Sequence, residues 1–190
     1  VAPPPAMPIH AVSAPSTWWD SPARYGRISR WLHWGMALLL AWQFVGMGLR
    51  LALGRTPLVA VFVGSHASVG LLLMLLVLLR GAWALANHGR RPPHGPGWLG
   101  RAAAAGHAAL YLLMVAVPLI ALVRAYGSGR ALVWFNTVPI FAAGPKDEAL
   151  TAPGVLHGPL AWVLLALVAG HVAMVALHRW AWRDEVAQRM

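Results

Sequence analysis

Four long apolar runs alternate with short polar stretches along this chain. The runs cover residues 28–53, 58–85, 101–123 and 153–178. Each run contains at least the roughly 20 residues that a helix needs to cross the hydrocarbon core of a bilayer. The pattern therefore predicts an all-α protein, an integral membrane four-helix bundle.

Polar segments flank and separate these runs. Residues 1–23 are so rich in proline and alanine that we expect a disordered tail there. The predicted transmembrane domain then occupies residues 24–185, and residues 186–190 form a C-terminal tail. The connection between the third and fourth runs, residues 124–152, is long, and long connections are usually functional. Its aromatic and apolar residues 134–141 predict a short element at the membrane interface.

The composition agrees with a membrane protein. Hydrophobic residues make up 59% of the chain and charged residues 11%, whereas soluble domains are about 45–50% apolar and about 25% charged. The net charge of +10 would suggest a nucleic-acid partner in a soluble protein. Here the basic residues lie beside the apolar runs, as membrane topology requires, so we expect no nucleic-acid partner.

The distribution of basic residues predicts the orientation of the bundle. Ten of the fifteen lysines and arginines lie in the N-terminal flank, around the connection between the second and third runs, or in the C-terminal tail. The other two connections hold the remaining five, Arg50, Arg55, Arg124, Arg130 and Lys146. Because cytoplasmic segments carry the excess of positive charge, both termini are expected in the cytoplasm.

Four histidines lie inside the apolar runs: His33, His66, His157 and His171. A single such histidine has a structural role as often as a functional one, because it can form a hydrogen bond across helices or line a cavity. His157 and His171, however, are fourteen residues apart, which places them on one helix face, roughly 21 Å apart along the axis. Their depths match those of His66 and His33, respectively. A non-haem metal site would need ligands that converge on one point, and this offset forbids that.

This arrangement favours two haems b, each bound non-covalently between two histidines, His33 with His171 and His66 with His157. The chain has no cysteine, which excludes iron–sulfur clusters, thiolate-ligated haem and covalent haem attachment. An iron with two imidazole ligands has no open position and suits electron transfer. His107 is a fifth membrane histidine, and a haem propionate, a quinone pocket and simple packing all remain open for it. Arg80 and Arg50 are either propionate partners or ordinary interface anchors.

Several segments resemble the prokaryotic cytochrome b561 family. They are Tyr25 to Trp34, with its Leu-His-Trp sequence; Ser65 to Gly70; Gly106 to Tyr111 with Pro118; and His157 with Gly170, His171 and His178. The resemblance extends over about residues 24–185, in order. It implies a four-helix cytochrome of the bacterial inner membrane with two haems b, whose iron ligands fall on His33, His66, His157 and His171. It also implies quinone chemistry.

Three functions are compatible with these observations. A member of the family similar to this chain oxidises superoxide at the outer face and passes electrons to ubiquinone, which implies a superoxide:ubiquinone oxidoreductase. The outer basic residues would attract such an anion, and Arg50 is the expected rim residue. The alternative is an electron-transfer subunit that relays electrons between a partner dehydrogenase or hydrogenase and quinone. A homodimer or a partner redox subunit is compatible with the sequence. The third is a transporter that uses its histidines as a proton relay.

Overall fold

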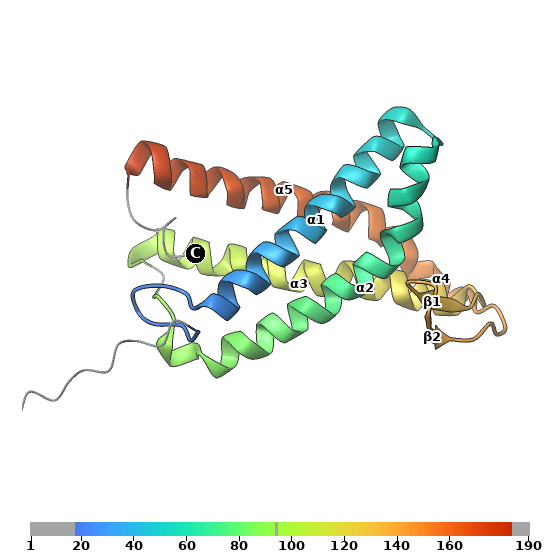
Figure 1. The fold of residues 1–190 in the computed structure, drawn as a ribbon, viewed down its shortest axis with the longest axis horizontal. Coiled ribbons are helices and arrows are strands. Elements are labelled where there is room, and N and C mark those ends of the chain that lie inside the picture. Colours follow the sequence, from blue (N-terminus) through green and yellow to red (C-terminus); the bar gives the residue numbers. More distant parts are fainter. Residues whose placement is uncertain (1–17, 94, 184–190) are drawn as a thin grey trace, which may run out of the picture.

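Four long helices dominate the computed structural model, which describes residues 18–93 and 95–183 (Figure 1). The first three are α1 (Arg27–Leu53), α2 (Pro57–Ala86) and α3 (Gly97–Gly127). The fourth span runs from Glu148 to Trp182. All four are long and apolar enough to cross a membrane, so the predicted transmembrane helical bundle is confirmed.

The fourth span is composed of several helical types. It begins with the short α4 (Glu148–Thr151), where the Asp147 carboxylate accepts hydrogen bonds from two backbone N–H groups. A 3-10 turn, η2 (Ala152–Leu156), follows, and then the long α5 (His157–Ala176) and a π-helical end, η3 (Leu177–Trp182). The 3-10 turn contains a proline, which lacks the N–H group that a continuous α-helix would use.

The helices pack unevenly within the described residues. Helix α1 packs closely on α2, α2 packs on α3, and α3 packs on α5, whereas α5 makes only sparse contacts with α1 and α2. A small apolar core, formed by Met36, Val69, Leu73 and Val77, joins α1 to α2. Most other large apolar side chains along the helices are partly or fully exposed on the protein surface, as expected for a bundle surrounded by lipid.

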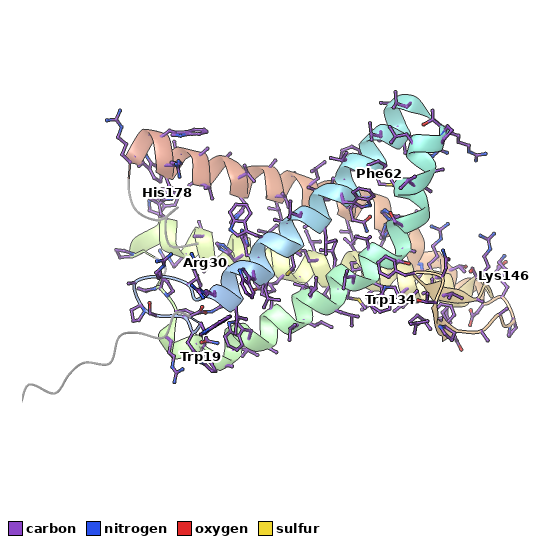
Figure 2. All side chains as sticks on the ribbon, viewed as in Figure 1. Trp19, Arg30, Phe62, Trp134, Lys146 and His178 are labelled. Atoms are coloured by element: carbon purple, nitrogen blue, oxygen red, sulfur yellow. The ribbon has the colours of Figure 1, made fainter. Side chains whose placement is uncertain are left out.

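The two ends of the bundle carry different groups (Figure 2). Trp19, Arg30 and His178 lie at one end, which we call the inner end, and Trp134 and Lys146 lie at the other, the outer end. These names follow the predicted orientation.

A β-hairpin lies in the long connection at the outer end. Its strands, β1 (Leu132–Trp134) and β2 (Val138–Phe141), pair antiparallel. The tight turn between them has positive φ angles at Phe135 (46°) and Asn136 (58°). The Trp134 Nε1–H donates to the Ser68 carbonyl at 2.9 Å, and the Phe135 N–H donates to Ser68 Oγ, also at 2.9 Å. The hairpin therefore stands where the sequence predicts an interfacial element, and it is attached to α2.

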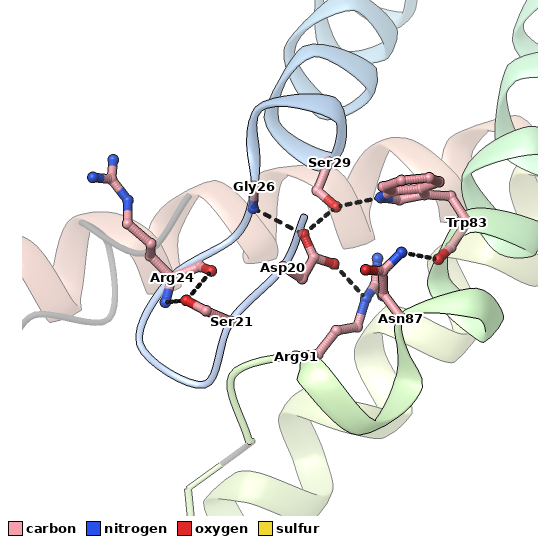
Figure 3. A network of polar contacts seen from close by, with 8 residues as sticks. All are labelled: Asp20, Ser21, Arg24, Gly26, Ser29, Trp83, Asn87 and Arg91. Carbon is pink, nitrogen blue, oxygen red and sulfur yellow. Dashed lines mark hydrogen bonds and ion pairs between the residues drawn. The ribbon is translucent and has the colours of Figure 1, made fainter. Parts of the chain in front are cut away.

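A polar network holds the chain just before α1 against the inner end (Figure 3). The Asp20 side chain accepts hydrogen bonds from the Gly26 N–H (2.8 Å) and the Ser29 hydroxyl (2.6 Å), and it pairs with Arg91 (3.1 Å). The Trp83 indole donates to the same Ser29 hydroxyl at 3.0 Å. Asp20 is 4% exposed. Residues 18–23, assigned to the disordered tail from the proline count, are thus bends with buried contacts. Residues 1–17 and the predicted tail at 186–190 lie outside the described residues.

Candidate haem-binding sites

The inner histidine pair joins α1 to α5. The rings of His33 and His171 face each other with their centroids 6.2 Å apart and their planes at 65°. Both residues are half-buried. They come from two helices that otherwise touch little, so the rings bridge the seam between α1 and α5.

The outer histidine pair joins α2 to α5 in the same way. The rings of His66 and His157 lie 6.0 Å apart, with their planes at 77°. His157 and His171 are the first and fifteenth residues of α5, which places the two pairs roughly 21 Å apart along that helix. The structure therefore brings together both pairs that matched depth predicts.

The ring separations suit one iron between each pair. A metal–imidazole bond is about 2.0–2.1 Å long and the nitrogen lies about 1 Å from the ring centre, so two imidazoles on opposite faces of an iron have centroids roughly 6 Å apart. Both observed separations are close to this value. A direct hydrogen bond between the rings is absent from the described contacts of either pair.

The second ring nitrogen is what orients a ligating histidine. The Nδ1 atom of His157 lies 3.0 Å from the Val117 carbonyl oxygen. Because a carbonyl oxygen only accepts, Nδ1 carries the proton, and Nε2 keeps its lone pair for a metal. The contact also fixes the ring between α3 and α5.

At the inner pair, Arg80 approaches the His33 ring. Its Nη1 donates to the His33 Nδ1 at 3.0 Å, and its guanidinium lies over the Tyr111 ring, 5.7 Å from the centroid. The Arg80 Nε and the Tyr111 hydroxyl are both buried without a hydrogen-bond partner. Within the described part of the chain, no carboxylate forms an ion pair with Arg80. A partly buried cation of this kind is suited to an anionic group such as a haem propionate.

His107 also belongs to the inner site. Its ring lies 5.3 Å from that of His171. Its Nδ1 donates to the Ala103 carbonyl oxygen at 2.7 Å, within its own helix. The sequence could not reveal this proximity, because it depends on the packing of α3 against α5.

Arg50, which was predicted to lie at the rim of the outer haem site, lies farther from that site, toward the outer end of the bundle. On the neighbouring turns of α1, Gln43 contacts the His66 backbone and Gly46 packs against Phe62. Continuing this antiparallel pairing places Arg50 near residue 58, roughly 12 Å beyond His66. Arg124 lies nearer the outer pair. Its aliphatic stem packs against Gly154, where a Cβ atom would collide with it, three residues before His157.

Two further residues near the histidine pairs did not emerge from the sequence pattern. Tyr111 is one turn from His107 on α3, and Gln43 is a buried polar residue in the apolar α1. The signal that was available for Gln43 is its polarity, because an uncharged polar side chain within a membrane span usually has a structural or functional partner.

Comparison with known proteins identifies the architecture around these pairs. A family model described as prokaryotic cytochrome b561 matches residues 24–190. The chain belongs to the prokaryotic cytochrome b561 family. Two similar proteins of Escherichia coli (strain K12) are cytochrome b561 homolog 2, 30% identical over 90% of this chain and 93% of the relative, and cytochrome b561 homolog 1, 25% identical over 88% and 96%.

Membership in the cytochrome b561 family makes this chain a bacterial membrane b-type cytochrome that transfers electrons, with haem b as its implied cofactor. The residues present fit that group. This chain offers two imidazole pairs whose ring separations fit one iron each, a partly buried arginine, and buried polar atoms without partners. Haem b supplies reversible one-electron chemistry at its iron when bound.

Proposed function

We propose that this cytochrome b561 carries two haems b and moves electrons across the membrane between them. His33 and His171 would ligate the inner iron, and His66 and His157 the outer iron. One observation carries this proposal. In each of two histidine pairs the ring centroids are separated by a distance that fits one iron, and the α5 members of the two pairs are fourteen residues apart. In each pair the Nε2 atoms would bind the iron and the Nδ1 atoms would carry the protons, as the contact of the His157 Nδ1 with the Val117 carbonyl oxygen supports.

Arg80 is proposed to hold a propionate of the inner haem. If Nε2 of His33 binds iron, its Nδ1 carries the proton, and Arg80, which can only donate, needs another acceptor. A carboxylate is the acceptor that a guanidinium binds best. His107, beside His171, would form part of the wall of the same pocket.

The orientation proposed from charge puts the inner end and both termini in the cytoplasm. Ten basic residues on that side against five on the other support it. A reporter that is active only outside the cytoplasm, fused after Met190, would be inactive in this orientation. An active reporter would reverse the assignment of the inner and outer haems.

We further propose superoxide as the electron donor at the outer end and ubiquinone as the acceptor in the membrane. Two superoxide anions would each give one electron and leave as dioxygen, and ubiquinone would take up both electrons with two protons to form ubiquinol. Arg124, beside Gly154 before His157, and Arg50 supply positive charge at the outer end that supports attraction of an anion.

Turnover by the purified chain tests this function. Protein in liposomes with ubiquinone receives a superoxide-generating system outside, and haem reduction and ubiquinol formation are followed together. Haem reduction coupled to ubiquinol formation is the expected result. No haem reduction by superoxide would remove superoxide as the donor and favour the alternative, an electron-transfer subunit that receives its electrons from a partner dehydrogenase or hydrogenase.

A further inference from the structure

A buried glutamine reaches from α1 to the histidine of α2 in the outer pair. The Gln43 side chain is 9% exposed, and its Nε2 donates to the His66 carbonyl oxygen at 2.9 Å. Gly70 makes room for it, because a Cβ atom at that position would lie 3.2 Å from the Gln43 Nε2. His66 and Gly70 are four residues apart and share one face of α2. The amide therefore lies on the helix face that carries the His66 ring.

Two polar atoms in this small region are buried and without a partner: the Gln43 Oε1 and the His66 Nδ1. The oxygen can only accept a hydrogen bond. The nitrogen donates one in the tautomer that leaves Nε2 for a metal. Buried polar atoms without partners are uncommon in proteins and require an explanation.

Three other histidines of the two sites, His33, His107 and His157, differ from His66 in this respect. The Nδ1 atoms of His33, His107 and His157 contact Arg80, the Ala103 carbonyl and the Val117 carbonyl, respectively. Only His66 among these has an Nδ1 that lacks a partner, and the side chain already bonded to its backbone carries an unused acceptor.

We propose that Gln43 is a positioning residue of the outer haem site. Its Oε1 accepts the Nδ1–H of His66 when Nε2 binds the iron, so the one amide holds both the backbone and the ring of this ligand. The proposal rests on the proposed function, in which His66 is an iron ligand. Such a hydrogen bond fixes the ring orientation and makes the imidazole more basic. A more basic ligand stabilises ferric iron relative to ferrous iron and so lowers the midpoint potential of the outer haem.

Redox titration of the purified haem-loaded protein tests the proposal, with visible and electron paramagnetic resonance spectra reporting each haem. In Gln43→Met, which keeps the volume but loses both polar groups, the outer haem should become easier to reduce. We expect a roughly tenfold shift in its ferrous-to-ferric ratio at a fixed potential, which is about 59 mV for one electron. The inner haem should not change. Gln43→Glu, which keeps an acceptor and loses the donor, should leave the outer midpoint at or below that of the wild type.

Trp42→Phe is the matched control. It removes the hydrogen bond from the Trp42 indole to Ser65 Oγ (3.0 Å), which joins the same two helices at the next position in sequence without using His66. Its two midpoints should equal those of the wild type. An unchanged outer midpoint in Gln43→Met would overturn the proposal and indicate another acceptor, such as the Phe62 carbonyl. Equal shifts of both haems would also overturn it. Fewer than two low-spin haem signals in the wild type would contradict the proposed di-haem function itself. The wild-type spectrum gives this result before any variant is compared.

Discussion

The inner and outer histidine pairs have nearly the same ring separation but different surroundings. The inner pair lies among a cation, a third imidazole and a phenol, from Arg80, His107 and Tyr111. The outer pair lies beside a backbone carbonyl and a buried amide, from Val117 and Gln43. The ligands are therefore equivalent and the electrostatics are not. Since haem potentials depend on charge, hydrogen bonding and burial, the two proposed haems should differ in potential.

The strongest test of the assignment of one haem to each pair is to remove one ligand from each pair in turn. His171→Ala should lose the inner haem and His157→Ala the outer haem, because an iron with one remaining imidazole is bound much more weakly. A pyridine haemochrome assay should give two haems per chain in the wild type and about one in each variant. One haem in the wild type, or two low-spin signals retained in His171→Ala, would contradict the assignment.

Removing the inner cation should shift the potential of the inner haem alone. Positive charge near an iron favours the ferrous form, so Arg80→Gln should lower the inner midpoint. A unit charge about 7 Å away at an effective dielectric constant of about 20 contributes roughly 2 kcal/mol, or about 100 mV for one electron. Potentiometric titration measures both midpoints. Arg90→Gln, at an exposed arginine that stacks on Trp19, is the control and should move neither.

Charge at the outer end should affect the rate of encounter with superoxide more than it affects the midpoint potentials of the haems. Arg124→Gln should slow haem reduction by superoxide roughly two- to tenfold at low ionic strength, and Arg50→Gln should have a smaller effect because it lies farther from His66. Stopped-flow reduction at several salt concentrations distinguishes them. A fast rate that ignores both salt and Arg124 would exclude electrostatic steering. Lys146 is partly neutralised by its ion pair with Glu148 (3.1 Å) and should matter least.

The smallest expected effects concern the segments that brace each end. Asp20→Asn leaves Arg91 without its charged partner and should cost about 1–3 kcal/mol of stability, whereas Trp134→Phe removes one neutral hydrogen bond worth about 0.5–1.5 kcal/mol. Thermal denaturation in detergent, followed by Soret absorbance, compares the two. A greater loss in Trp134→Phe would show that the outer hairpin dominates, and equal losses would also contradict the expected order.

The periodic features of the chain were the predictable ones. Four spans follow from apolar run length, and the association of His33 with His171 and of His66 with His157 follows from depth, because a straight helix converts sequence spacing into position. Both predictions use quantities that can be worked out for each helix separately, namely its length and the depth of its histidines. The helix bounds differ from the predicted runs by a few residues, most at the fourth span, which begins at Glu148 within the predicted connection; α3 likewise continues to Gly127.

The remaining contacts between elements were not predictable in this way. The partner of His107 depends on how α3 packs on α5, and the level of Arg50 depends on the pairing of α1 with α2. The ordered bends around Asp20 arise from contacts with Arg91, seventy-one residues later, which a local count of prolines ignores. The same holds for Gln43, whose importance becomes visible only when its neighbour across the helix seam is known.

The sparse packing of α5 against α1 and α2 has a consequence for how the protein is assembled in the cell. Inserted spans normally associate through close van der Waals contact and interhelical hydrogen bonds. Here the backbone of α5 comes close to those of α1 and α2 at few places, and histidine rings face each other across both seams. Iron–imidazole bonds would then hold α5 against the α1–α2 hairpin. Haem supply would therefore control maturation. In haem-starved cells the fourth span of the inserted chain would stay loosely packed against the first two. Such a chain would be a preferred substrate of membrane quality-control proteases.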